Sequence, residues 1–284
     1  MKKIILSADS TCDLSSDLLE KYKIHTLPLY INLDDKEYKD MINITPDFIY
    51  DYYDKNKILP KTAAPSIGDY LGHFEQWNNE DYDIIHVSIG SGISASYQNA
   101  TLAANELDNV YVIDSKSLST GSGALLVEAY EMINEGKSTD EIVERLKELR
   151  EKLDVSFIID SLTYLREGGR LTALQAFGAN LLNIKPSIFV SSQKNGQMDV
   201  GNKYRGNINK VFIKFFKDKL EDNDEIDLRR IYLTHSGADE ADIELAKNTI
   251  SSLKNFEEII VNKASCTISS HCGRNTFGII FLKK

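Results

Sequence analysis

Short apolar runs alternate with amphipathic segments through the first half of the chain. The short runs are typical of buried strands, and segments with apolar residues every three or four positions predict helices. Predicted strands cover residues 3–7, 25–33, 84–89 and 110–114, and predicted helices cover 15–22, 46–51, 66–77, 97–107, 124–134 and 139–153. Strands that alternate with helices favour a mostly parallel, doubly wound sheet.

The pattern changes near residue 154, where strands and helices no longer alternate regularly. A predicted strand at 155–159 precedes helical segments that reach residue 182. The runs 186–192 and 198–204 predict a hairpin, because an Asn-Gly pair, Asn195-Gly196, lies between them. Helices at 208–219 and 239–253 are interleaved with strands at 230–234, 258–261 and 276–282. We therefore predict a two-domain α/β protein, with a doubly wound domain over 1–155 and a mixed-sheet domain over 156–284.

A glycine- and hydroxyl-rich turn follows the strand at 84–89. Its sequence is Gly90-Ser91-Gly92-Ile93-Ser94-Ala95-Ser96, and a helix is predicted to begin directly after it. A turn between a strand and a helix points backbone N–H groups and hydroxyls at an anion. We expect a phosphate or a carboxylate to bind near Ser94, with Ser91 and Gly92 supporting the turn.

The same turn permits a second hypothesis, an NAD(P)-dependent oxidoreductase. Residues Gly90 to Ala95 match the dinucleotide pattern G-x-G-x-x-A, and Asp114 ends the next strand, where an acidic residue would hold the ribose. Two observations count against this alternative. The pattern usually lies on the first strand of its domain, and a pyrophosphate does not need so many hydroxyls. A serine hydrolase is weaker still, because His86 replaces the first glycine of a nucleophile elbow.

Three polar side chains elsewhere are suited to anion binding. Thr62 lies in a loop that Pro65 makes rigid, Arg170 follows the double glycine Gly168-Gly169, and His271 lies in a polar segment expected to be a loop. A guanidinium binds a carboxylate or phosphate through two hydrogen bonds, and a histidine can donate one. Each residue could equally be an ordinary surface side chain.

Charge and composition narrow the class of protein. Lys and Arg number 33 and Asp and Glu number 43, which gives a net charge of −10. Nucleic acid and anionic membrane surfaces are therefore poor partners. The first apolar stretch ends at Asp9, so no signal peptide is predicted, and no segment approaches the roughly 20 apolar residues of a membrane span. Three cysteines, expected in loops, favour a reducing cytoplasm, and their spacing around His271 is not that of a zinc site.

Several motifs, taken in order along the chain, resemble the DegV family of bacterial fatty-acid-binding proteins. The resemblance runs from residue 8 to the last predicted strand. The matching stretches are Ala8-Asp9-Ser10-Thr11-Cys12-Asp13-Leu14, Thr62 with Pro65-Ser66, Gly92-Ile93-Ser94, Val112-Ile113-Asp114-Ser115, Tyr164-Leu165-Arg166-Glu167-Gly168-Gly169-Arg170-Leu171, Leu182-Asn183-Ile184-Lys185-Pro186, Thr234-His235-Ser236-Gly237 and His271-Cys272-Gly273. The chain departs from the family pattern at Ala63-Ala64 and at Ala95-Ser96, and keeps the hydroxyls of Thr62 and Ser94.

This resemblance implies a carrier with no catalytic residues and no cofactor. A long-chain fatty acid such as palmitate would lie between two α/β domains, with its carboxylate bound by Thr62 and Ser94 and with Arg170 and His271 nearby. The family presents this acid to a separate ATP-dependent fatty acid kinase, which makes the acyl phosphate for phospholipid metabolism. Arg205 matches the arginine implicated in meeting that kinase. The chain itself shows no kinase or P-loop signature.

Overall fold

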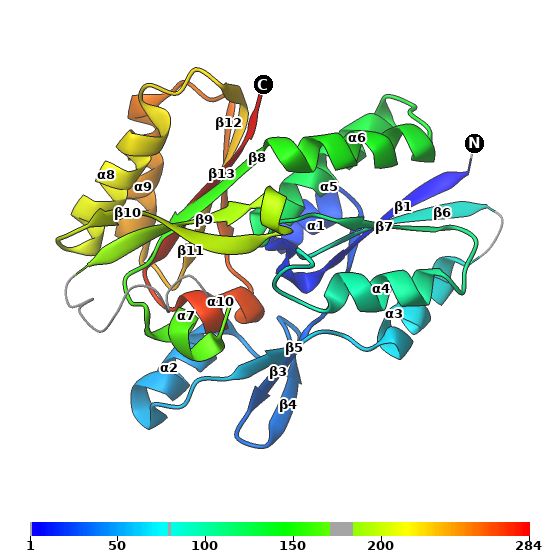
Figure 1. The fold of residues 1–284 in the computed structure, drawn as a ribbon, viewed down its shortest axis with the longest axis horizontal. Coiled ribbons are helices and arrows are strands. Elements are labelled where there is room, and N and C mark those ends of the chain that lie inside the picture. The colour runs from blue at the N-terminus through cyan, green and yellow to red at the C-terminus, as the bar shows by residue number, and fades with distance from the viewer. Residues whose placement is uncertain (1, 79–80, 171–183) are drawn as a thin grey trace.

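The computed structural model describes residues 2–78, 81–170 and 184–284, which form two large sheets and one small one. Figure 1 shows the two large sheets side by side, with the small sheet below them. The predicted two-part α/β architecture is confirmed: the first large sheet is parallel and the second is mixed. Within the described residues, no helix has the length and apolar character needed to cross a bilayer.

The first sheet has four parallel strands in the order β2-β1-β6-β7. They are β1 (Lys3–Asp9), β2 (Ile24–Leu27), β6 (Tyr82–Ser88) and β7 (Val110–Asp114). Apolar residues of β6 alternate between two cores, because successive strand side chains face opposite sides of the sheet. Ile84 packs in a cluster with Tyr70 and Phe74, whereas Ile85 belongs to the larger cluster on the other face.

Five helices flank this sheet or connect its strands. They are α1 (Ser16–Lys21), α3 (Ile67–Phe74), α4 (Ser96–Ala104), α5 (Thr120–Asn134) and α6 (Thr139–Lys152). Ser66 caps α3 through a capping box with Asp69, as its position after Pro65 predicts. Helices α5 and α6 contribute to a cluster that also contains Tyr232 and Ile280 of the second sheet, so these helices are packed between the two sheets.

The second sheet has six strands in the order β10-β9-β8-β13-β11-β12. They are β8 (Leu153–Ile158), β9 (Lys185–Ser191), β10 (Gln197–Tyr204), β11 (Ile226–Ser236), β12 (Glu258–Lys263) and β13 (Thr276–Lys283). Helices α8 (Ile208–Leu220) and α9 (Glu240–Leu253) cover one face with a phenylalanine-rich core. The predicted β9–β10 hairpin is confirmed, and Asn195 and Gly196 adopt the positive φ angles of 54° and 89° that such a turn requires. The helical segment predicted to reach residue 182 lies, from 171 to 182, outside the described residues.

The prediction of one strand over 25–33 is wrong. The chain leaves the first sheet at Pro28, and β3 (Tyr30–Leu33) pairs instead with β4 (Lys36–Lys39) and β5 (Lys61–Ala63) in the small sheet. Proline ends the strand because it has no N–H to donate to a neighbour. Thr62 therefore lies on a strand opposite Ile31, not in a loop.

A second correction concerns the segment that contains His271, which is a helix. Helix α10 (Cys266–Cys272) begins after Ser265, whose side chain accepts a hydrogen bond from the backbone N–H of Ile268. Buried carboxylates bond its first N–H groups: Asp13 accepts from Ser265 and Asp40 from Cys266. Because this helix is buried on nearly every side, it has no amphipathic pattern from which to predict it. It contacts α2 (Pro46–Asn56) and α7 (Thr163–Gly168).

Candidate functional site

One cavity brings together four residues that the family resemblance implies for carboxylate binding. Thr62 on β5, Ser94 in the turn between β6 and α4, Arg170 just after α7 and His271 on α10 all line it. More than 200 positions separate the first of them from the last, so only the tertiary fold places them around one space. Figure 1 shows β5, α7 and α10 meeting below the second sheet.

Thr62 and His271 are hydrogen-bonded to each other in this cavity. The distance between Thr62 Oγ1 and His271 Nε2 is 2.9 Å. Burial, and after it the positive charge of Arg170, lowers the pKa of His271 to about 4. At neutral pH the imidazole is therefore uncharged and offers one N–H donor. The pair supplies a hydroxyl and a ring nitrogen, both neutral, on one wall of the cavity.

Gly168 packs directly against the other ring nitrogen of His271. A Cβ atom placed on Gly168 would lie 2.2 Å from His271 Nδ1, which is far inside contact distance. His271 Nδ1 itself is buried and has no hydrogen-bond partner among the described residues. The double glycine after Glu167 therefore has two functions: Gly168 leaves room for the imidazole, and Gly169, at φ 67°, ends α7 and directs the chain toward Arg170.

Arg170 lies at the exposed rim of the cavity. Its Nη1 donates to the carbonyl oxygen of Gly168 at 2.9 Å, which fixes the guanidinium close to its own turn. The side chain remains exposed, in contrast to the buried wall of the cavity. A positive charge in this place attracts an anion to the opening without requiring a desolvated ion pair.

Ser94 contributes its hydroxyl at the start of α4. Its Oγ lies 2.9 Å from Ser96 Oγ and accepts from the backbone N–H of Ser96 at 3.2 Å. Ala95 occupies the N-cap position and has no side chain that could bond the first N–H groups of the helix. The positive end of the α4 dipole therefore lies next to the Ser94 hydroxyl, where it favours a negatively charged ligand.

The rest of the glycine-rich turn bonds to the protein itself. Ser91 donates to Asp114 from both its backbone N–H and its hydroxyl, and the Gly92 N–H donates to the carbonyl of Asn195 at 2.8 Å. A Cβ atom on Gly92 would lie 2.7 Å from the carbonyl oxygen of Lys194, so glycine here permits close approach of the β9–β10 hairpin. Ser91 and Gly92 are not among the described residues that line the cavity.

These contacts give the dinucleotide hypothesis no support. The N–H groups of Gly90, Ser91 and Gly92, which would hold a pyrophosphate, already bond to acceptors within the chain. Asp114, which would hold a ribose, instead accepts hydrogen bonds from Ser91 and from the backbone N–H of Lys116. The glycines that match the pattern serve chain packing, which produces the same sequence signature.

The remaining wall of the cavity is apolar except for Thr267, whose hydroxyl donates to Asp40. Its described apolar side chains are Leu29, Ala63, Ala64, Ile89, Ile93, Leu118, Leu165, Met198, Ile268 and Cys272. A second cavity adjoins it, shares Leu118, Ile268 and Cys272, and is also lined by residues of the neighbouring strands β8, β13 and β11. Sequence reasoning missed most of these residues, because an apolar side chain that lines a cavity has no signal that distinguishes it from ordinary core.

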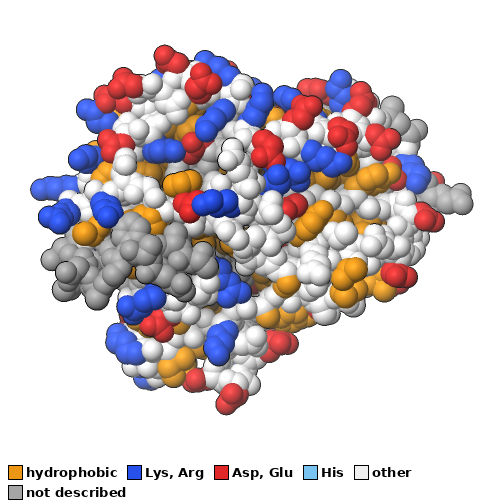
Figure 2. All heavy atoms as spheres, in the orientation of Figure 1, with side chains coloured by type: hydrophobic (Ala, Val, Ile, Leu, Met, Phe, Trp, Pro, Cys, Tyr) orange, Lys and Arg blue, Asp and Glu red, His pale blue; other side chains and the backbone are white. Residues whose placement is uncertain are grey.

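Arg205 lies apart from this cavity. It is exposed directly after the end of β10, and it is not among the described residues that line either cavity. Elsewhere on the surface, Figure 2 shows acidic and basic side chains interspersed over α6, α8 and α9, without the single-sign field that nucleic-acid binding requires.

Comparison with known proteins agrees with the fold. The model of the DegV family, described as a family of uncharacterised proteins, matches residues 3–284. A DegV domain-containing protein of Clostridium acetobutylicum is 33% identical over 287 residues and covers 100% of both chains. Another, from Caldanaerobacter subterraneus, is 32% identical over 288 residues, also with 100% coverage of both.

Solved structures similar to this chain include proteins that are described with fatty acid binding or a bound fatty acid. A DegV family protein from Thermus thermophilus, described by its fatty acid binding, has 31% identity and a TM-score of 0.88, covering 99% of this chain and 100% of that one. A DegV family protein from Eubacterium eligens, loaded with heptadecanoic acid, has 26% identity and a TM-score of 0.85 with the same coverage. The match over nearly the whole sequence and the shared fold show that this chain belongs to the DegV family.

Proposed function

We propose that this protein binds a long-chain fatty acid and presents it, in the cytoplasm, to a separate ATP-dependent fatty acid kinase. The observation that carries the proposal is the cavity in which Thr62, Ser94 and His271 lie beside a mostly apolar wall. Polar groups gathered at one place in an apolar cavity fit an amphipathic ligand with one charged end. The acid would lie between the predicted domains 1–155 and 156–284, because residues from both line this cavity.

Neutral donors suit a carboxylate that must later react. The Thr62 and Ser94 hydroxyls can donate to the oxygens of a carboxylate, and the uncharged imidazole of His271 holds the Thr62 hydroxyl in place, so the group can leave water without a large penalty. Arg170, at the exposed rim, adds favourable charge without enclosing the carboxylate in an ion pair. The carboxylate oxygen then stays available to attack a phosphoryl group that a partner brings.

The acyl chain would extend along the apolar wall. Each buried CH₂ group contributes about 0.8 kcal/mol, so a long chain binds tightly wherever it is fully enclosed. The two cavities have volumes of only about 50 and 30 Å³. Leu118, Ile268 and Cys272, which line both, would therefore have to change position for a long chain to pass from one cavity into the other.

The first test of this function is the lipid content of the purified protein. Organic extraction and mass spectrometry are expected to find a long-chain fatty acid in a near-stoichiometric amount, because both its charged end and its chain would be enclosed. After the lipid is removed, calorimetric titration with palmitate should restore one site. Protein that carries no fatty acid and shows no saturable binding of palmitate would contradict the proposal.

The second test concerns the partner and Arg205. We propose that Arg205 contacts the kinase, since it is exposed, lies away from the cavity and matches the family pattern. An Arg205→Ala variant is expected to bind palmitate normally and to lose most of its kinase-dependent formation of acyl phosphate. The reason is that removing a charge from the edge of the proposed interface with the kinase slows docking. Lys247→Ala, which removes a positive charge from the exposed face of α9, serves as the control. Equal acyl phosphate formation by both variants would contradict the proposed role.

A further inference from the structure

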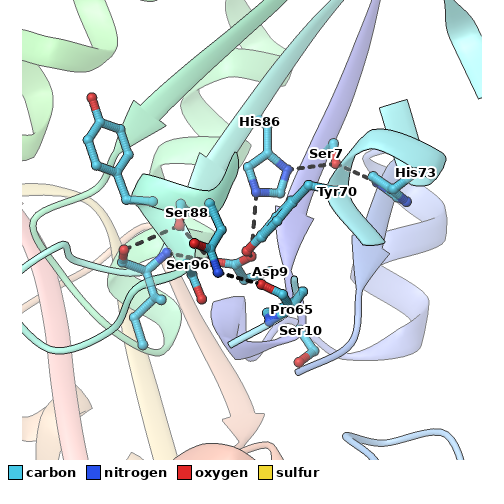
Figure 3. Close-up of polar contacts among 12 residues, drawn as sticks. Ser7, Asp9, Ser10, Pro65, Tyr70, His73, His86, Ser88 and Ser96 are labelled. Atoms are coloured by element: carbon cyan, nitrogen blue, oxygen red, sulfur yellow. Dashed lines mark hydrogen bonds and ion pairs between the residues drawn. The ribbon is translucent and has the colours of Figure 1, made fainter. Parts of the chain in front are cut away.

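A buried hydrogen-bond network lies behind the Ser94 turn and is centred on Asp9, the last residue of β1 (Figure 3). Asp9 Oδ1 accepts from the Tyr70 hydroxyl at 2.5 Å, and Asp9 Oδ2 accepts from the hydroxyl of Ser88 and the backbone N–H of Ile89, both at 2.8 Å. His86 Nε2 lies 3.4 Å from Asp9 Oδ1. Three hydrogen-bond donors and the His86 ring nitrogen therefore surround one carboxylate that is 1% exposed.

This carboxylate is held in its charged form. Burial alone would raise the pKa of Asp9, but the neighbouring His86 imidazole, and then the hydrogen bonds from Tyr70 and Ile89, lower the pKa below its usual value. A charged carboxylate accepts hydrogen bonds about twice as strong as those of a neutral acceptor. The segments that donate these bonds are therefore fixed firmly relative to β1.

The donors come from both segments that carry the proposed carboxylate ligands. Ser88 and Ile89 end β6 and begin the turn that contains Ser94. Tyr70 lies on α3, the helix that follows the strand of Thr62 after a short link. Asp9 therefore holds, with one side chain, the turn that bears one hydroxyl and the helix that follows the other.

A second bond ties the same two segments together nearer the cavity. Asn99 Nδ2 on α4 donates to the carbonyl oxygen of Pro65 at 2.8 Å. Pro65 lies between Thr62 and α3, and α4 begins two residues after Ser94. The segment of Thr62 and the segment of Ser94 are therefore linked twice, once through the Asn99–Pro65 hydrogen bond and once through the hydrogen bonds to Asp9.

The other side of the network fixes His86. His86 Nδ1 lies 2.9 Å from Ser7 Oγ, which in turn lies 2.8 Å from His73 Nε2. Burial, and after it the neighbouring His86, lowers the pKa of His73 to about 4. The His73 imidazole is therefore neutral at physiological pH. The chain of bonds orients the His86 ring so that its Nε2 faces Asp9 (Figure 3).

The grouping of Ser7, His86 and Asp9 contains the residue types of a hydrolase triad, and its burial excludes that role. Ser7 and His86 are 0% exposed, and none of the three is among the described residues that line the two cavities. A nucleophile that no substrate can reach does not catalyse a reaction. The network supports neighbouring segments instead.

We propose that Asp9 is a positioning residue, which sets the Thr62 and Ser94 hydroxyls at the spacing that one carboxylate needs. The proposal rests on the proposed function, because the spacing matters only if both hydroxyls bind the same ligand. Asp9 acts through Ser88, Ile89 and Tyr70 and does not touch the ligand. Its loss would therefore weaken binding of the carboxylate without removing a ligand-binding group.

The test uses Asp9→Asn, which keeps the size of the side chain but replaces one acceptor oxygen with an NH₂ group that faces donors. Affinity for palmitate is expected to fall about tenfold. Asp83→Asn is the matched control, because Asp83 is also a buried carboxylate, near the opposite end of β6, and it accepts from Thr139. The control is expected to lose stability in a similar way and to change palmitate affinity by less than about twofold.

A double variant separates positioning from general damage to the fold. If Asp9 acts through Ser94, adding Asp9→Asn to Ser94→Ala should cost less affinity than Asp9→Asn costs in the wild type. The proposal would be overturned if the loss of palmitate affinity in the double variant equalled the product of the two single losses. Unchanged affinity in Asp9→Asn would also overturn it. Should Asp9→Asn fail to fold, Tyr70→Phe and Ser88→Ala each remove one donor, and the same reduced affinity and non-additivity are expected.

Hydrogen exchange supplies a measurement that does not depend on the ligand. Backbone amides of residues 89–96 are expected to exchange faster in Asp9→Asn than in the wild type and to be unchanged in Asp83→Asn. Unchanged exchange in Asp9→Asn would contradict positioning whether or not palmitate binds. If the wild-type protein binds no palmitate, and exchange is still faster in Asp9→Asn, the proposed function is contradicted. The role of Asp9 in shaping the turn is then supported.

Discussion

A Thr62→Val, Ser94→Ala double variant is expected to bind palmitate about 100-fold more weakly than the wild type. A hydrogen bond to a charged acceptor contributes about 1.5 kcal/mol or more, and 1.4 kcal/mol is a factor of ten in affinity. Both substitutions keep nearly the same side-chain volume, so the loss reflects hydroxyls and not shape. His271 loses its partner at the same time, because Thr62 Oγ1 bonds His271 Nε2.

Titration calorimetry and thermal unfolding, measured together, check this prediction. A Thr249→Val, Ser251→Ala variant is the control, since both hydroxyls bond to carbonyl oxygens within α9, away from the cavity. The control should bind palmitate with wild-type affinity. If the Thr62, Ser94 variant also retains wild-type affinity, the carboxylate binds elsewhere.

A Gly168→Ala variant is expected to lower palmitate affinity by roughly tenfold, although alanine is the better helix former. The new Cβ would lie 2.2 Å from His271 Nδ1, so the imidazole must move out of its place. Because His271 Nε2 bonds to Thr62, the movement also disturbs the Thr62 hydroxyl. One methyl group at the end of α7 thereby disturbs two of the proposed ligands.

Gly72→Ala is the matched control for this substitution. Gly72 lies on α3, and a Cβ atom there would meet nothing within 4 Å. Alanine at this position should leave affinity unchanged and raise stability by up to about 1 kcal/mol. The histidine ring resonances in an NMR spectrum should shift in Gly168→Ala and not in Gly72→Ala. Wild-type affinity with unshifted His271 resonances in Gly168→Ala would show that the site tolerates the methyl group.

The sequence alone predicted most elements whose residues follow one period. The parallel first sheet, the long helices α5, α6, α8 and α9 and the β9–β10 hairpin were correctly expected, because apolar spacing and turn residues act locally. The elements that were predicted wrongly also have a physical explanation. Pro28 divides a continuous apolar run, and the buried α10 lacks a polar face, so neither has a clear periodic signal.

The glycines show how a local pattern can mislead. Gly90 and Gly92 match a dinucleotide pattern, and in the structure they allow the β9–β10 hairpin to approach the turn. Gly168 looks like the end of a helix, and it also makes room for His271. The sequence shows that a side chain is missing at these positions, but the neighbour that requires its absence comes from a distant part of the chain.

By itself, the sequence determined the fold class, the family resemblance and a set of hydroxyl, arginine and histidine candidates spread over more than 200 positions. Only the tertiary structure decided that Thr62, Ser94, Arg170 and His271 line one cavity, while Ser91 and Gly92 bond to the protein itself. The physical reason is that chemistry depends on distance in space. Residue type and local spacing are set along the chain, whereas the closeness of β5, the β6–α4 turn, α7 and α10 results from tertiary packing of these segments around α10.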